Sequence, residues 1–133
     1  MLIPATRYRD CEAALAFITG VLGLTEHAVY RNAAGDIVHA QVSLGRGMLM
    51  FGPAQGGAFD RLMTDPRAAG GVTTSIYGIV DDVAAHHARA AAAGAEIVVP
   101  LAAQDHGGSA YSIRDSEGHV WTFGDYDPWM TED

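Results

Sequence analysis

The chain contains no lysine and only one cysteine, Cys11, among its 133 residues. Eight arginines oppose sixteen acidic residues, so the formal net charge is −8 at pH 7. A protein that binds a phosphate backbone needs a clustered basic surface, and this composition excludes nucleic acid as a partner. The acidity serves either solubility or the attraction of a cationic small molecule, and the charge alone leaves both open.

The sequence also lacks long apolar runs and signs of export. No apolar stretch approaches the ~18 residues that a bilayer span requires, so we expect no membrane partner. The first residues, Met1-Leu2-Ile3-Pro4, carry no basic region followed by a hydrophobic stretch, and a single cysteine cannot form an internal disulfide. We therefore expect a cytoplasmic protein. Its mass of 14.0 kDa fits one domain, or two small modules that share a core.

Hydrophobic periodicity and turn residues predict the same order of elements twice. The first half is expected to form strand, helix, strand, strand and strand over residues 2–8, 11–22, 25–31, 37–44 and 48–51. The second half repeats this order over residues 72–80, 83–93, 96–99, 110–114 and 119–123. Asp10 and Asp82 stand where each helix needs an N-cap, and glycines follow both helices.

An offset of 72 residues superimposes one half on the other. It places Asp10 on Asp82, Phe51 on Phe123 and Gly52 on Gly124. We interpret this as a tandem duplication of a βαβββ unit within a single domain, residues 1–133. The parts are module 1 (about 1–52), a connection rich in Gly, Ala and Pro (53–71), module 2 (about 72–126) and an acidic tail (127–133).

Three segments resemble a known family, the vicinal oxygen chelate superfamily of glyoxalases, bleomycin-resistance proteins and ring-cleaving dioxygenases. The segments are Arg9–Phe17, the hairpin strand Val38–Gly45 and the turn Asp115-Ser116-Glu117-Gly118-His119-Val120-Trp121, which has Ser116 where the family usually has proline. The resemblance implies an α+β fold in which two tandem βαβββ modules form a curled mixed sheet with helices on the convex side. It places a ligand or metal on the concave side.

Metal-using members of this family hold the ion with four His, Glu or Gln side chains from the first and last strands of each unit. Carried onto this sequence, these positions are Ile3, Met50, Ser75 and Thr122, and the offset of 72 relates the first pair to the second. A divalent first-row metal needs imidazole, carboxylate or thiolate donors. We therefore expect neither a metal site at these positions nor a cofactor.

Strand parity predicts which side chains face the concave side. It separates an apolar, helix-facing set from a mixed, inward-facing set on the hairpin of residues 37–51. Val38, Ala40, Val42, Leu44, Leu49 and Phe51 form the expected helix-facing set. The candidate ligand-binding residues are His39, Gln41, Met48, Met50, Ser75, Tyr77, Arg114 and Thr122, with Ser43, Ser112 and Val120 on the same side and Arg7 at the rim.

A concave surface with a few convergent polar groups favours a small-molecule site. One hypothesis is a metal-free binding protein that sequesters a basic or aromatic antibiotic or metabolite. The other hypothesis is an enzyme of the same fold, namely a lyase, isomerase or transferase. Such an enzyme would use His39 as an acid–base residue or hold a metal at a non-standard position. No residue other than His39 is a catalytic candidate. Exposed sheet edges also lead us to expect a homodimer.

Overall fold

The computed structural model describes residues 1–130 and divides the chain into two compact units. The first unit runs from Met1 to Gly71, and the second begins at Val72. Residues 131–133, the end of the expected acidic tail, lie outside the described residues. Across residues 1–130, no helix combines the length and the apolar character that a membrane span requires.

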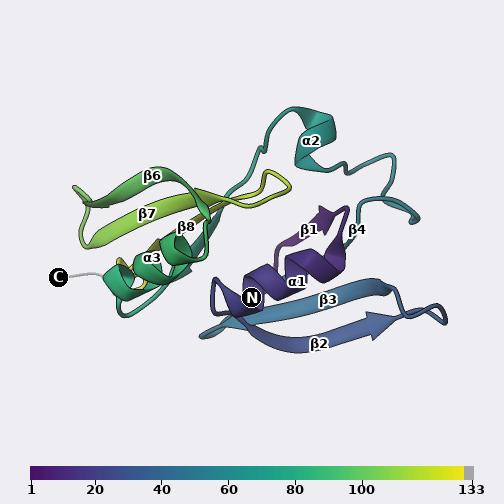
Figure 1. Cartoon of the computed structure of the whole chain (residues 1–133), viewed down its shortest axis with the longest axis horizontal. Helices are drawn as coiled ribbons and strands as arrows, with labels where there is room; N and C mark the ends of the chain where they lie inside the picture. Colours follow the sequence, from purple (N-terminus) through teal and green to yellow (C-terminus); the bar gives the residue numbers. More distant parts are fainter. Residues whose placement is uncertain (131–133) are drawn as a thin grey trace. The chain divides into compact units, whose positions relative to one another are not determined.

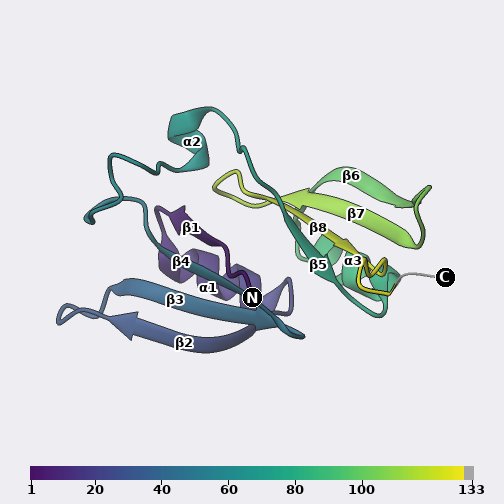
Figure 2. The same cartoon turned by 180° about the vertical axis from the view of Figure 1, so that it is seen from behind.

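The first unit is a four-stranded mixed sheet with one long helix on its face (Figure 1). Its elements are β1 (Ala5–Tyr8), α1 (Cys11–Gly20), β2 (Thr25–Arg31), β3 (Ile37–Leu44), β4 (Gly47–Pro53) and the short α2 (Pro66–Ala69). The strand order is β1-β4-β3-β2, in which β1 runs parallel to β4 and the other neighbours are antiparallel. Seen from behind, β4 passes in front of α1 (Figure 2).

The second unit repeats this architecture. Its elements are β5 (Ile76–Ile79), α3 (Val83–Ala92), β6 (Glu96–Ala103), β7 (Ser109–Arg114) and β8 (Val120–Gly124). The order β5-β8-β7-β6 has the same pattern of one parallel pair and two antiparallel pairs. The expected α+β fold with two tandem βαβββ modules is therefore confirmed, with one four-stranded sheet in each unit.

Local chemistry confirms the offset of 72 residues. The Asp10 carboxylate accepts the Ala13 amide at 3.0 Å, and the Asp82 carboxylate accepts the Ala85 amide at 2.9 Å, which satisfies an orphan donor at each helix start. The glycines that end β4 and β8 also correspond. A Cβ on Gly52 would stand 3.1 Å from the Val38 carbonyl oxygen, and one on Gly124 would stand 3.0 Å from the Ser109 carbonyl oxygen. Both units thus use glycine for a close strand approach.

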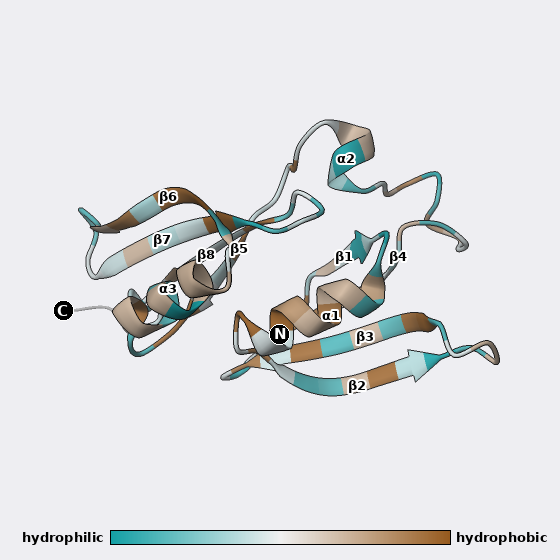
Figure 3. Cartoon of the chain, in the orientation of Figure 1, coloured by the Kyte–Doolittle hydropathy of each residue, from teal (hydrophilic) through white to brown (hydrophobic). Residues whose placement is uncertain are grey.

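Apolar side chains on one face of each sheet form the core beneath the helix. In the first unit, α1 buries Leu15 and Ile18 over the sheet residues Ala40, Val42 and Phe51. Hydropathy alternates along β3, because residues that face the helix alternate with residues that face the other side of the sheet (Figure 3). In the second unit the buried apolar residues include Val83, Ala90, Tyr111, Ile113, Trp121 and Phe123.

Several expected boundaries and one expected face are wrong. β1 begins at Ala5 rather than Leu2, since Pro4 has no N–H to donate to the ladder, and β5 is limited to Ile76–Ile79. Helix α1 ends at Gly20, two residues early. Val38 is 45% exposed instead of core, because a register shift in the pairing of β2 with β3 turns Ile37, 4% exposed, to the buried side.

Candidate functional site

A groove of about 320 Å³ lies in the first unit, between the sheet and the loop that follows β4. Most of its lining is apolar, with an imidazole and a guanidinium as the charged or chargeable groups. Its lining residues are Ala5, Thr6, Arg7, Val38, His39, Met50, Phe51, Gly52, Pro53, Gln55, Gly56, Gly57, Phe59 and Met63. A mainly apolar concavity with a few polar groups is the usual form of a site for a small organic molecule.

The sheet register builds the floor of this groove. Ala5 pairs with Met50 in the parallel ladder, and Arg7 pairs with Gly52 two residues further on. Since strand side chains alternate between faces, these four residues share the face opposite α1, whereas Tyr8 and Phe51 turn to the core. Gly52 has no side chain, and the floor stays open at that position.

His39 contributes the imidazole of the floor and is held by two neighbours. The Gln41 side-chain amide nitrogen lies 3.2 Å from His39 Nε2, and the Tyr30 ring centroid lies 5.8 Å from that of His39. The tautomer of the ring decides which of the two side chains donates in this contact. The contact holds the imidazole in place on the groove floor.

Arg7 binds the last residue of β4 and two residues of the loop that follows it. Its guanidinium donates to the Pro53 carbonyl oxygen at 2.9 Å, to the Met63 carbonyl oxygen at 3.3 Å and to Asp60 Oδ1 at 2.8 Å. The Arg7 residue is only 7% exposed. A planar guanidinium presents several donors in a fixed geometry, which lets one side chain bind acceptors from distant parts of a loop.

Asp60 joins this arrangement from the loop side. Its carboxylate also accepts the Gly56 amide at 3.0 Å and the Gly57 amide at 3.1 Å. The hydrogen bond from Arg7 and the two backbone amides lower the pKa of Asp60 from 3.8 to about 2. The carboxylate is therefore charged throughout the physiological range and holds the loop as an anion.

Of the residues predicted to bind a ligand, the structure brings His39 and Met50 together in the groove. Gln41 and Met48 lie on the same sheet face, since Gln41 pairs with Met50 and Ser43 with Met48. Gln41 acts through its contact with His39, and Met48 lies two residues away from Met50 along β4.

The other predicted residues belong to the second unit. Thr122 lies opposite Tyr77 in the parallel ladder and makes a hydrogen bond of 2.6 Å with the Ser112 hydroxyl. Ser75 is exposed and precedes β5. Arg114 forms an exposed ion pair with Glu96 at 2.9 Å, which joins β7 to β6.

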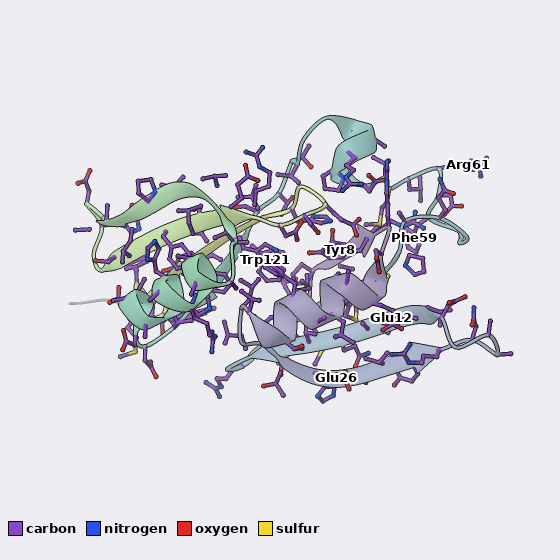
Figure 4. The ribbon with its side chains drawn as sticks, viewed as in Figure 1. Tyr8, Glu12, Glu26, Phe59, Arg61 and Trp121 are labelled. Atoms are coloured by element: carbon purple, nitrogen blue, oxygen red, sulfur yellow. The ribbon has the colours of Figure 1, made fainter. Side chains whose placement is uncertain are left out.

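Sequence reasoning missed the roof of the groove, which is the loop containing Phe59 and Met63. In Figure 4, Phe59 lies on this loop beside the ends of β1 and β4, and Arg61 points away from them. Residues 53–71 were expected to be a connection rather than an element because they are rich in Gly, Ala and Pro. The Arg7 side chain that anchors the loop is 53 residues from Asp60 and 56 from Met63, beyond the reach of local patterns.

Comparisons with known proteins identify the family. Residues 4–123 match the family model of the Glyoxalase/Bleomycin resistance protein/Dioxygenase superfamily. The chain belongs to this superfamily. The crystal structure of TioX from Micromonospora sp. ML1 is similar at a TM-score of 0.75 and 30% identity, with 98% of this chain and 99% of TioX covered.

Other superfamily structures share the fold at lower identity. A glyoxalase/bleomycin resistance protein from Streptomyces sp. CB03234 has a TM-score of 0.66 at 19% identity, with coverage of 92% of this chain and 96% of that one. Lactoylglutathione lyase from Agrobacterium tumefaciens has a TM-score of 0.66 at 20% identity, with coverage of 98% and 96%. No curated protein gave a sequence match to the chain.

The residues at the superfamily's metal positions do not fit a metal ion. In the first unit the strand residue beside Met50 is Ala5, and in the second the residue beside Thr122 is Tyr77. Both partners lie two residues further along than Ile3 and Ser75. Neither alanine nor methionine offers an oxygen or nitrogen donor, and neutral hydroxyls are weak ligands for first-row metals. Residues 1–130 contain no group of three or more His, Cys, Asp or Glu side chains that could hold a metal.

Proposed function

We propose that this protein binds a small organic molecule in the groove of its first unit without a metal ion, and that its role is to sequester that molecule. The observation that supports this most directly is the groove itself, which combines an apolar floor and roof with one oriented imidazole. Names among the solved superfamily structures include both a bleomycin resistance protein and a lyase, so the fold alone does not choose between binding and catalysis.

The apolar lining and the net charge favour a basic or aromatic ligand. Met50 and Met63 supply flexible, polarizable walls, and sulfur contacts with aromatic rings are favourable by about 0.3–1.5 kcal/mol. Phe59 is 57% exposed and offers a ring to a ligand. The Arg7 guanidinium is held by Asp60 and two carbonyl oxygens, while the whole chain carries −8, which disfavours an anionic ligand.

His39 serves binding better than catalysis in this geometry. A general base must offer a free nitrogen lone pair to the substrate proton. The Gln41 side chain already engages Nε2, so this nitrogen is occupied by a protein partner. We therefore assign His39 the orientation of a ligand through a hydrogen bond to a carbonyl or hydroxyl group. The cytoplasm, where the single buried thiol of Cys11 would remain reduced, is the compartment that we propose.

The test is a ligand screen followed by a matched pair of variants. Thermal shift with basic glycopeptides, aromatic antibiotics and the cationic dye thioflavin T would identify binders. Met50→Arg should then weaken binding at least about tenfold, because a guanidinium on the groove floor fills the groove and repels a cationic ligand. Met48→Arg makes the same change on the same face of β4, two residues from Met50, and should bind nearly as the wild type does. Equal binding by Met50→Arg and wild type would contradict the proposal.

A further inference from the structure

The loop over the groove is anchored at both ends by contacts with the first strand and its flanking residue. At its start, the Ala54 amide donates to the Tyr8 carbonyl oxygen at 2.9 Å. At its end, Asp65 caps α2 and forms an ion pair of 2.9 Å with Arg9. Between these points, residues 55–63 form tight turns of their own, with hydrogen bonds from the Leu62 and Met63 amides to the Phe59 carbonyl oxygen, each 2.8 Å.

The segment has features of a movable cover. Gly56 has a φ of +103°, a conformation that glycine adopts without strain, and Gly57 follows it directly. Two large apolar side chains, Phe59 and Leu62, are 57% and 77% exposed. Few apolar contacts and exposed backbone hydrogen bonds are typical of a segment that opens locally at low free-energy cost.

Arg7 connects this segment to the floor. Its guanidinium reaches Asp60 in the middle of the segment and Met63 at the end, while its own backbone pairs with Gly52 in the sheet. The Asp60 carboxylate in turn gathers the Gly56 and Gly57 amides at the start. A single buried cation therefore holds the beginning, middle and end of residues 55–63 against β1.

We propose that residues 55–63 form a lid over the groove and that Arg7 is the positioning residue that holds this lid closed. The lid separates from Arg7 when a ligand enters or departs. This inference rests on the proposed binding function. The ligand need not touch Arg7, because the guanidinium acts through the placement of Phe59 and Met63. The Arg7–Asp60 pair then sets how often the groove opens.

The first measurement needs no ligand. Amide hydrogen exchange of the full chain should show faster exchange at Leu62 and Met63 in Asp60→Asn, by about 2- to 10-fold, since an ion pair between the buried Arg7 and the exposed Asp60 is lost. These two amides donate to the Phe59 carbonyl oxygen and not to the Asp60 carboxylate, so their exchange reports how far the turn within the lid loosens once Arg7 no longer holds Asp60. The matched control is Glu12→Gln, which removes the exposed Glu12–Arg31 ion pair of α1 and β2 in the same unit. The Glu12→Gln variant should leave amide exchange in the lid unchanged. Glu12 is labelled in Figure 4.

The second measurement is stopped-flow binding of thioflavin T. Asp60→Asn should raise both the association and the dissociation rate constants, whereas Glu12→Gln should raise neither. Arg7→Lys keeps the charge but cannot reach all three acceptors, and it should resemble Asp60→Asn. The lid proposal would be overturned if Asp60→Asn bound and released the dye at the wild-type rates. Unchanged amide exchange at Leu62 and Met63 in that variant would overturn it as well. If the wild-type chain binds no dye and no other compound in the screen, the binding function fails, and the exchange experiment alone decides whether Arg7 holds the loop.

Discussion

The three consecutive residues Leu49, Met50 and Phe51 allow a sharp test of which sheet face is core and which is groove. Leu49 and Phe51 are 4% and 1% exposed, and the Phe51 ring meets Tyr8 edge-on with 5.2 Å between centroids. Met50 lies between them in sequence but on the groove floor. We expect Leu49→Asp and Phe51→Asp to unfold the protein and Met50→Glu to leave it folded.

The magnitudes follow from burial. Loss of a buried leucine or phenylalanine side chain costs about 1.5–3 kcal/mol, and an unpaired carboxyl group in the core adds about 2–7 kcal/mol. The sum approaches or exceeds the ~5–15 kcal/mol by which a typical domain is stable. Met50→Glu leaves its carboxylate in contact with water and should cost about 1 kcal/mol, or about 2–8 °C in melting temperature.

Circular dichroism melting of the three variants beside wild type and Met48→Glu provides the measurement. The two aspartate variants should show no cooperative transition or one far below wild type. Met50→Glu should melt within a few degrees of Met48→Glu, because both place a carboxylate on the same face of β4. A melting temperature for Met50→Glu as low as that of Leu49→Asp would refute the assignment of the two sheet faces. The assignment of Met50 to the groove floor would then also be wrong.

Three further predictions concern titration, metals and assembly. Arg7 and the loop amides hold the pKa of Asp60 at about 2, against 3.8 in the unfolded chain. The Asp60 carboxylate therefore stabilises the folded state fully above pH 3.8, and this contribution is lost as the pH falls towards 2. The melting-temperature difference between wild type and Asp60→Asn should thus be constant above about pH 5 and shrink between about pH 4 and pH 2; a difference that vanishes already near neutral pH would contradict this. Elemental analysis of purified protein should find well below one Zn, Ni, Mn or Fe per chain, whereas about one metal per chain that is lost in Thr122→Ala would refute the prediction. Light scattering should give twice the chain mass of 14.0 kDa. The reason is that the edge strands of the two described sheets, β1 and β2 in the first and β5 and β6 in the second, each have a hydrogen-bonded neighbour on one side only. A particle of single-chain mass at micromolar concentration would exclude the dimer.

The fold was predictable from sequence because its signals are local. Asp10 and Asp82 cap their helices through amides three residues ahead, a contact that residue type and spacing predict. The hairpin of β3 and β4 follows the alternation of apolar and polar residues, and the register that pairs Gln41 with Met50 confirms the predicted faces there. Strand ends were less accurate, since a register shift near Val38 depends on the partner strand and leaves no mark in the sequence of β3 alone.

The groove was only half predictable for the same reason. Its floor, with His39 and Met50, follows from strand parity. Its roof depends on Arg7, which was placed at the rim of the first strand, and on Asp60, 53 residues away. A composition of Gly, Ala and Pro describes a loop correctly but does not say that a buried guanidinium will bind it. Long-range ion pairs of this kind require coordinates.

Comparison of the two repeats explains why the groove lies in the first unit. At the offset of 72 residues, Ala5 corresponds to Tyr77 and Arg7 to Ile79. The Tyr77 hydroxyl donates to the Tyr126 carbonyl oxygen at 2.7 Å and lies 2.7 Å from where a Cβ on Gly124 would stand, so this side chain covers the space above that glycine. The small Ala5 leaves the space above Gly52 open, and Arg7 provides a cation that Ile79 cannot replace. The two units therefore share their helix caps, strand register and glycines. Two differences on the first strand, Ala5 against Tyr77 and Arg7 against Ile79, separate the open groove of the first unit from a face that the Tyr77 side chain covers in the second.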